Sequence, residues 1–405
     1  GRRPAWLIRL GLFLYDTLGG RKILLGTRTV DLTTDPVGAP LKDKFTRAFE
    51  YSDCWVEDSR LVVLNARDAQ DRGARIATRT KVTAAERQGA LWQVLLQDQD
   101  TGTISTAYAR AMVNAAGPWV AEVIQGALRI NAREGVRLVR GSHIVTKRLY
   151  DHDKCYFFQG EDGRIIFAIP YETDFTLIGT TDQDHPDPGT APVCTDEEAE
   201  YLCAFASKYF DTPIGLRDVV WRYSGVRPLY DDGASSATAA TRDYVLSRDT
   251  GSGAPLLNIF GGKITTYRRL AEEAVEKVLP DQGPAWTHDA PLPGGAFPVE
   301  GVEGLITSLR QSHPFLDPAW ARRLVRAYGT EAAEILGDAK TAEDLGPHFG
   351  ANLTGAEVDW LVAREFARSA TDILWRRSKL GLRIDAAGRT ALEAYLRDGD
   401  KTARA

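Results

Sequence analysis

The side chains best suited to chemistry are concentrated between residues 223 and 268, in the motifs YSGVRPL, TRDY and FGGKITTYR. In the third motif Gly261 and Gly262 follow the apolar run PLLNIF, and Lys263, Ile264, Thr265 and Thr266 then begin a predicted helix. Unbonded N–H groups at a helix start, next to a lysine ammonium, favour binding of an anion. A tight turn without any ligand is the alternative for a Gly-Gly pair before a helix.

Arginines in the other two motifs can complete such an anion site. Arg227 lies in YSGVRPL and Arg242 in TRDY, and a planar guanidinium matches phosphate better than an ammonium does. For a single arginine, a surface or ion-paired role is the alternative. An ATP-binding Walker loop is excluded, because Leu257 stands where its first glycine is required and Ile264 follows the lysine where serine or threonine is required.

Composition predicts a globular chain that binds neither nucleic acid nor metal. The 405 residues are enough for more than one domain, 43% of them are hydrophobic, and the net charge of -5 argues against a general nucleic-acid binder. The four cysteines, Cys54, Cys155, Cys194 and Cys203, are scattered without CxxC spacing, so we expect neither a zinc site nor a disulfide framework. This cysteine pattern fits a reducing compartment.

The first thirty residues differ from the rest of the chain in charge. Basic residues at 2, 3, 9, 21, 22 and 28 stand against Asp16 alone, around the apolar stretch Ala5 to Leu18. This stretch is too short for a transmembrane helix. A short basic amphipathic helix can lie in a membrane interface, attracted by anionic lipid. A helix that packs against a protein core is the alternative.

Hydrophobic periodicity predicts a mixed order of helices and strands. Residues 59–72 have helical spacing, and three alternating runs between residues 75 and 109 predict a three-stranded meander. The meander leads into AMVNAAG, in which Ala115, Ala116 and Gly117 are small enough to let a ligand approach the backbone.

A second set of strands predicts an antiparallel sheet. It consists of VRLVRGSHIVT, CYFFQ, RIIFAIPY, FTLIGTTD and RDVVWRYSGVRPL, and a helix with a capping box at Thr195 and Glu198 stands before the last of them. After the linker PLPGGAFP at 291–298, helical periodicity dominates. A second capping box is predicted there at Thr354 and Glu357.

Long motifs in this order resemble one family, the FAD-dependent respiratory glycerol-3-phosphate dehydrogenases. The resemblance covers nearly the whole chain, because it runs through RPAWLIRLGLFLYD, FEYSDCWVEDSRLV, NAAGPWV, RGSHIV, IGTTD, the three motifs above, PLPGG and DILWRR. It implies an α/β (α+β) fold of the glutathione-reductase/D-amino-acid-oxidase type, with an antiparallel-sheet substrate domain and a helical C-terminal cap.

One departure from the family is large. The family opens with a strand, a GxGxxG-type turn and a helix that hold the FAD pyrophosphate, and this chain begins at Gly1 without them. We therefore expect an N-terminal truncation that removes the first dinucleotide-binding βαβ. The expected domains are an incomplete FAD-binding domain at 54–134 and 239–290, a substrate domain at 1–53 and 135–238, and a helical C-terminal domain at 299–405.

The resemblance implies catalytic roles for individual residues. His143 is expected to accept the C2 hydroxyl proton, although a hydrogen-bonded structural histidine is the alternative. Arg227 is expected beside that hydroxyl, and Arg242 on the substrate phosphate. Thr180 and Thr181 in IGTTD are expected in or behind the substrate pocket, with an ordinary strand role equally open.

Two turns are implied to bind FAD. They are the turn of Ala115, Ala116 and Gly117, and the turn from Gly261 and Gly262 to Thr266. Lys263 has two expected positions, at the substrate or at the pyrimidine edge of the flavin. In the second position the N–H groups of Thr265 and Thr266 would stabilise the negative charge that reduction leaves there.

The implied reaction is oxidation of sn-glycerol 3-phosphate to dihydroxyacetone phosphate, with electrons passing through FAD to a membrane quinone. The implied location is cytoplasmic, peripheral on the cytoplasmic face of the inner membrane, and a homodimer is compatible with it. Two alternatives stay open. One is an alpha-glycerophosphate oxidase that reduces O2, and the other is a non-catalytic fragment unable to hold FAD.

Overall fold

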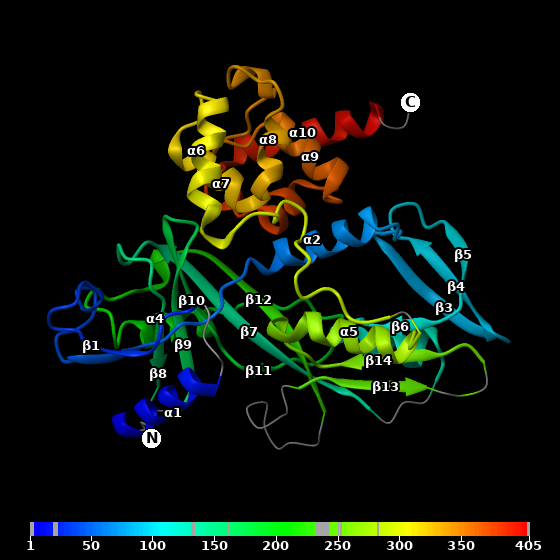
Figure 1. Ribbon diagram of the computed structural model, residues 1–405, viewed down its shortest axis with the longest axis horizontal. Coiled ribbons are helices and arrows are strands. Elements are labelled where there is room, and N and C mark those ends of the chain that lie inside the picture. Colours follow the sequence, from blue (N-terminus) through cyan, green and yellow to red (C-terminus); the bar gives the residue numbers. More distant parts are fainter. Residues whose placement is uncertain are drawn as a thin grey trace. The chain divides into compact units, whose positions relative to one another are not determined.

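The computed structural model describes residues 4–18, 23–130, 134–160, 163–231, 243–249, 251, 253–281 and 283–402, and the chain divides into two units. The first unit, Gly1–Trp55 with Lys81–Gly283, contains the sheets. The second unit, Val56–Thr80 with Pro284–Ala405, is helical (Figure 1).

The largest sheet of the first unit is antiparallel and is built on the long strand β7 (Val136–Lys147). One edge of β7 pairs with β12 (Val219–Tyr230). The other edge pairs with β10 (Phe175–Gly179) and, farther along, with β11 (Gln183–Asp184). The sheet continues from β10 to β9 (Ile165–Tyr171) and β8 (Tyr156–Gln159). The predicted antiparallel sheet is therefore confirmed.

Helix α4 (Asp196–Ala206) packs on this sheet and has the predicted capping box. The Glu198 N–H donates to Thr195 Oγ1, and the Glu198 carboxylate accepts the Thr195 N–H. Leu202 and Phe205 of the helix are buried with Ile144 and Ile166 of the sheet. The hairpin of β1 (Arg28–Asp31) and β2 (Arg47–Glu50) adds Val30 to this core, whereas helix α1 (Ala5–Leu18) has no buried residue.

Two smaller sheets complete the first unit. The predicted meander is confirmed as β3 (Thr80–Gln88), β4 (Leu91–Asp98) and β5 (Ile104–Ala109). The other sheet has the order β13 (Val245–Asp249), β14 (Leu256–Phe260), β6 (Met112–Asn114), and β14 runs parallel to β6. Helix α5 (Tyr267–Val278) follows β14, and the short helix α3 (Val120–Glu122) follows β6.

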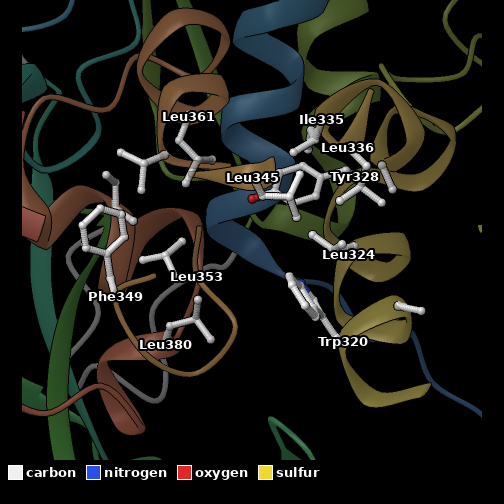
Figure 2. Packing of buried hydrophobic residues seen from close by; sticks show 14 of the residues in the cluster. Trp320, Leu324, Tyr328, Ile335, Leu336, Leu345, Phe349, Leu353, Leu361 and Leu380 are labelled. Atoms are coloured by element: carbon white, nitrogen blue, oxygen red, sulfur yellow. The ribbon is translucent and has the colours of Figure 1, made fainter. Parts of the chain in front are cut away.

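The second unit is a bundle around one apolar core. Trp320, Leu324 and Tyr328 of α7 pack with Leu353 and Leu361, as Figure 2 shows. The helices of this unit are α2 (Asp58–Asp71), α6 (Val302–Ser312), α7 (Pro318–Tyr328), α8 (Ala332–Leu336), α9 (Gly355–Arg364) and α10 (Ala386–Thr402).

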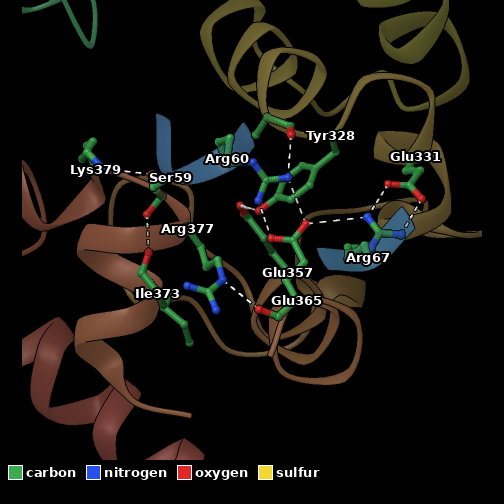
Figure 3. Close-up of polar contacts among 12 residues, drawn as sticks. Ser59, Arg60, Arg67, Tyr328, Glu331, Glu357, Glu365, Ile373, Arg377 and Lys379 are labelled. Atoms are coloured by element: carbon green, nitrogen blue, oxygen red, sulfur yellow. Dashed lines mark hydrogen bonds and ion pairs between the residues drawn. The ribbon is translucent and has the colours of Figure 1, made fainter. Parts of the chain in front are cut away.

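Helix α2 enters this bundle through buried arginines. The Arg60 guanidinium bonds both carboxylate oxygens of Glu365, and Arg67 makes two bonds of 2.7 Å to Glu331 (Figure 3). The predicted FAD-binding domain at 54–134 included this helix, and that boundary is wrong because residues 56–80 lie in the helical unit. The helix is placed by ion pairs with glutamates that are distant in sequence. Such pairs produce no periodic pattern in the sequence that could predict them.

The predicted capping box at Thr354 and Glu357 is also wrong. Thr354 stands at the N-cap of α9 but makes no side-chain capping bond. The Glu357 carboxylate is 1% exposed and instead accepts bonds from Arg323 and from the Tyr328 hydroxyl. An arginine guanidinium is a stronger partner for a buried carboxylate than a backbone N–H of its own helix.

Glu365→Ala should destabilise the second unit strongly, because the buried Arg60 guanidinium loses the carboxylate that it bonds. We expect the free energy of unfolding to fall by about 3–5 kcal/mol, measured by urea unfolding with tryptophan fluorescence. Glu393→Ala is the matched control, since it breaks an exposed pair with Arg389 and should change stability by under about 0.5 kcal/mol. Equal effects of the two substitutions would contradict this role for the buried pair.

Candidate active site

Strand β7 brings three predicted site residues together. His143 lies opposite Gly179 of β10 on one edge and opposite Tyr223 of β12 on the other. Arg227 lies four residues farther along β12, and Thr180 directly follows β10. The antiparallel register therefore places segments that are distant in sequence around one stretch of β7.

The His143 imidazole is held between these neighbours. Its ring stacks on the Tyr223 ring with 5.0 Å between centroids and an interplanar angle of 10°. A Cβ atom at Gly179 would lie 2.1 Å from His143 Cδ2, so a side chain at position 179 would displace the imidazole. Glycine at 179 and tyrosine at 223 thus fix the plane of the ring.

The Arg227 guanidinium is held by the segment that follows β10. Its Nη1 donates to the Asp182 carboxylate at 2.5 Å, and its Nη2 donates to Thr180 Oγ1 at 2.9 Å. A Cβ atom at Gly141 would lie 2.7 Å from Nη2, so the missing side chain there makes room for the guanidinium over β7. The Arg227 side chain is 38% exposed, which leaves its other N–H groups accessible to a ligand.

A buried polar network lies beside the contact of Arg227 with Thr180 and Asp182. Thr181 Oγ1 accepts the Ser142 N–H at 3.0 Å and donates to Glu198 at 2.9 Å. Glu198 also accepts from Arg140 at 3.0 Å. Burial raises the pKa of Glu198, but hydrogen bonds from Thr195, Ser142 and Thr181 and the charge of Arg140 outweigh it, so the net pKa lies below its usual value. The carboxylate is therefore ionised at neutral pH.

The two predicted cofactor turns lie at neighbouring strand ends. Strands β6 and β14 are parallel, so Ala115, which follows β6, and Gly261, which follows β14, lie at the same edge of the sheet. The Asn114 amide, at the end of β6, donates to Asn258 in the middle of β14 at 3.1 Å and links the two strands. The carboxyl edge of parallel strands is where folds of this type bind dinucleotides.

The second turn offers backbone donors. Gly261 and Gly262 have φ of 72° and 105°, a conformation that favours glycine. No acceptor in the described part of the chain takes the N–H groups of Lys263, Ile264 and Thr265. The predicted helix start differs by a few residues, because Ile264–Thr266 is a 3-10 turn and α5 begins at Tyr267. In that turn the Thr266 N–H donates to Lys263, so it is engaged rather than free.

Strand β12 connects the two groups of residues. A Cβ atom at Gly117 would lie 4.0 Å from Pro228, and one at Gly261 would lie 3.4 Å from the Tyr230 nitrogen. Both turns therefore border the residues that directly follow Arg227.

Arg242 lies outside the described residues. A nearby open cavity of about 450 Å³ is lined by residues such as Pro118, Arg137 and Asp184, and none of the predicted catalytic residues lines it.

Three further residues of the site have no role implied by the sequence motifs. Asp182 pairs with Arg227, Tyr223 stacks on His143, and Glu198 anchors Thr181. Asp182 and Tyr223 stand inside the motifs IGTTD and YSGVRPL. Their closeness in sequence to Thr180 and Arg227 is therefore the feature by which the sequence could have indicated them. No group of three His, Cys, Asp or Glu side chains within the described ranges could hold a metal ion.

Comparison with protein families matches both parts of the chain. The family described as FAD dependent oxidoreductase matches residues 14–268, and the C-terminal domain of alpha-glycerophosphate oxidase matches residues 285–397.

Curated relatives match nearly the whole chain. A D-erythritol 1-phosphate dehydrogenase of Brucella abortus is 47% identical over 96% of this chain and 78% of its own length. A glycerol-3-phosphate dehydrogenase of Pseudomonas aeruginosa is 46% identical over 97% of this chain and 77% of its own. The aerobic glycerol-3-phosphate dehydrogenase of Escherichia coli is 43% identical, with coverages of 97% and 79%.

A solved structure supports the same assignment. The glycerol-3-phosphate dehydrogenase of Bacillus halodurans complexed with FAD has a TM-score of 0.70 at 27% identity, covering 84% of this chain and 68% of that one. With the geometry of the turns and of the β7 sheet, these matches show that the chain belongs to the FAD-dependent oxidoreductases of the glycerol-3-phosphate dehydrogenase family.

Proposed function

We propose that the chain oxidises sn-glycerol 3-phosphate to dihydroxyacetone phosphate and that its electrons pass through FAD to a membrane quinone. The observation that carries the proposal is the Arg227 guanidinium, which Asp182 and Thr180 hold over Gly141 of β7, two residues from His143. The residues that follow Arg227 on β12 border the two cofactor turns. The names of the relatives at 46% and 43% identity support this substrate.

The residues of the β7 sheet perform the proton chemistry in this proposal. FAD, when bound, supplies the two-electron acceptor that no side chain can provide. The half-buried His143 accepts the proton of the C2 hydroxyl. Arg227 donates to the same oxygen and stabilises the negative charge that develops as the proton leaves. Asp182 and Thr180 keep that donor in place beforehand.

The cofactor turns fit a negatively charged or carbonyl-bearing group. The N–H groups of Lys263, Ile264 and Thr265 and the exposed Lys263 ammonium present positive charge at one turn, and Ala115, Ala116 and Gly117 offer close approach at the other. We assign these residues to FAD. We propose that Arg242 binds the substrate phosphate, and its position in the motif TRDY supports this role.

A second candidate substrate is D-erythritol 1-phosphate, which is favoured by the 47% identity to a dehydrogenase named for it. Both compounds are phosphorylated polyols, so the roles of His143 and Arg227 apply to either. The ratio of kcat/KM for the two compounds decides between them. The named relatives are dehydrogenases, which favours quinone over O2 as the acceptor, and hydrogen peroxide formation without quinone would indicate the oxidase.

Arg227→Ala should lower kcat for glycerol 3-phosphate by roughly 100- to 1000-fold, because one donor to the developing charge is lost. FAD should stay bound, as checked by flavin absorbance of the purified holoenzyme. Arg222→Ala is the matched control on the same strand, since Arg222 is exposed and pairs with Asp196. Unchanged turnover of Arg227→Ala would defeat the assignment of this residue.

We further propose that the protein attaches peripherally to the cytoplasmic face of the inner membrane through α1. The side chains of Trp6, Leu10 and Phe13 recur on one face of this helix and are 48–68% exposed. The described helices include none long and apolar enough to cross a membrane. An interfacial helix with basic residues nearby is attracted to anionic lipid. Homodimer formation remains an additional proposal that rests on the family.

Replacing Trp6, Leu10 and Phe13 together by serine should reduce binding to vesicles that contain anionic phosphatidylglycerol, because the apolar face of α1 is lost. Co-sedimentation measures the bound fraction. Val62→Ser is the control, since Val62 is an exposed apolar residue of α2. If the triple variant binds vesicles as tightly as the unmodified protein does, α1 is not the attachment site.

A further inference from the structure

We infer that Thr181, anchored by Glu198, is a positioning residue for Arg227 and sets its catalytic alignment. The inference rests on the proposed function, because it assumes that Arg227 contacts the substrate hydroxyl. Thr181 itself contacts neither substrate nor cofactor and acts through the two residues that flank it.

The segment Thr180–Asp182 is held on two sides. Thr180 and Asp182 both bond the Arg227 guanidinium, on Nη2 and Nη1. Thr181 between them is 2% exposed and turns to the protein interior, where its hydroxyl joins the Ser142 N–H to Glu198. A shift of Thr181 therefore moves both contacts of the arginine at once.

Glu198 is a rigid anchor for this segment. It is 8% exposed and accepts hydrogen bonds from Thr181, from Arg140 and from the Thr195 N–H that caps α4. Because α4 packs on the sheet through Leu202 and Phe205, the anchor is tied to the main core of the unit. Few other arrangements satisfy so many buried polar groups.

The anchor reaches the other side of the site as well. Ser142, whose N–H bonds Thr181, precedes His143 on β7, and its hydroxyl shares a 2.7 Å hydrogen bond with Ser224, which follows Tyr223 on β12. The same network thus fixes the strands that carry the imidazole and its stacking partner. Arg227 depends on this network more directly than His143 does, since Thr180 and Asp182 are the covalent neighbours of Thr181.

The test is a set of substitutions in the FAD-loaded protein. Thr181→Val keeps the shape but removes the hydroxyl, which leaves the Ser142 N–H and Glu198 without this partner. We expect kcat for glycerol 3-phosphate to fall by roughly 10- to 100-fold with little change in KM, since small misplacements affect the reacting geometry most. Thr181→Ser should restore most of the turnover, because it retains the hydroxyl.

Thr176→Val is the matched control. Thr176 lies on β10, is 1% exposed, and its hydroxyl accepts the Leu149 N–H, so this variant loses a buried threonine hydroxyl and its hydrogen bond to a backbone N–H outside the Thr180–Asp182 segment. It should lower the melting temperature as Thr181→Val does and leave kcat unchanged. A loss of kcat equal to that of Thr181→Val would show a general stability effect and overturn the inference.

A double-mutant cycle with Arg227→Ala separates positioning from structure. If Thr181 acts through Arg227, Thr181→Val lowers kcat only while the arginine is present and costs nothing further in the Arg227→Ala background. The same fold-loss in both backgrounds would overturn the inference and leave the proposed function intact. If the unmodified FAD-loaded protein does not oxidise glycerol 3-phosphate, the proposed function fails. If Arg227→Ala alone has full turnover, the proposed role of Arg227 fails and the inference with it, while the proposed reaction stands. Glu198→Gln serves in the same cycle if Thr181→Val does not fold.

Discussion

The bond between the Arg227 guanidinium and the segment Thr180–Asp182 is the interaction on which the site depends. A guanidinium on a long, flexible side chain has many orientations, and the Asp182 carboxylate with the Thr180 hydroxyl selects one of them. The carboxylate also offsets the positive charge while leaving part of the fork accessible. With its charge partly offset, the guanidinium is suited to stabilising negative charge that develops during a reaction, and less suited to tight binding of any anion.

The second constraint is the parallel pairing of β6 and β14. It places the turn that begins at Ala115 and the turn that begins at Gly261 at one edge, and a hydrogen bond from Asn114 to Asn258 links the two strands. Both turns border β12 just past Arg227. One strand thus runs from the ring that stacks on His143, past Arg227, to the two turns, so a single element connects the residues proposed for the substrate with those proposed for the cofactor.

Much of this arrangement could be predicted from sequence where the signal is local. Alternation gave the strands of both antiparallel sheets, and the spacing of Thr195 and Glu198 gave a capping box that forms. The partners of buried charges could not be read in this way. Arg60 and Arg67 sit on a helix whose spacing suggested only an apolar face, and Glu357 binds Arg323 instead of capping its helix.

The site shows the same division. The types and motifs of His143, Arg227 and Thr180 made them candidates, whereas Asp182 meets Arg227 only after β10 and β11 pair with β7, and Glu198 meets Thr181 only through helix α4. The pairing of Asp182 with Arg227 follows no spacing rule, because the two residues are 45 positions apart in the sequence and meet only in the folded sheet.

The most direct test is a crystal structure of the FAD-loaded protein with dihydroxyacetone phosphate bound. We expect the C2 oxygen to lie within hydrogen-bonding distance of the Arg227 guanidinium, about 2.7–3.2 Å, while Thr180 and Asp182 keep their contacts with it. A ligand whose C2 oxygen lies against other residues, with Arg227 bonded to Asp182 and Thr180 alone, would refute the proposed role of Arg227.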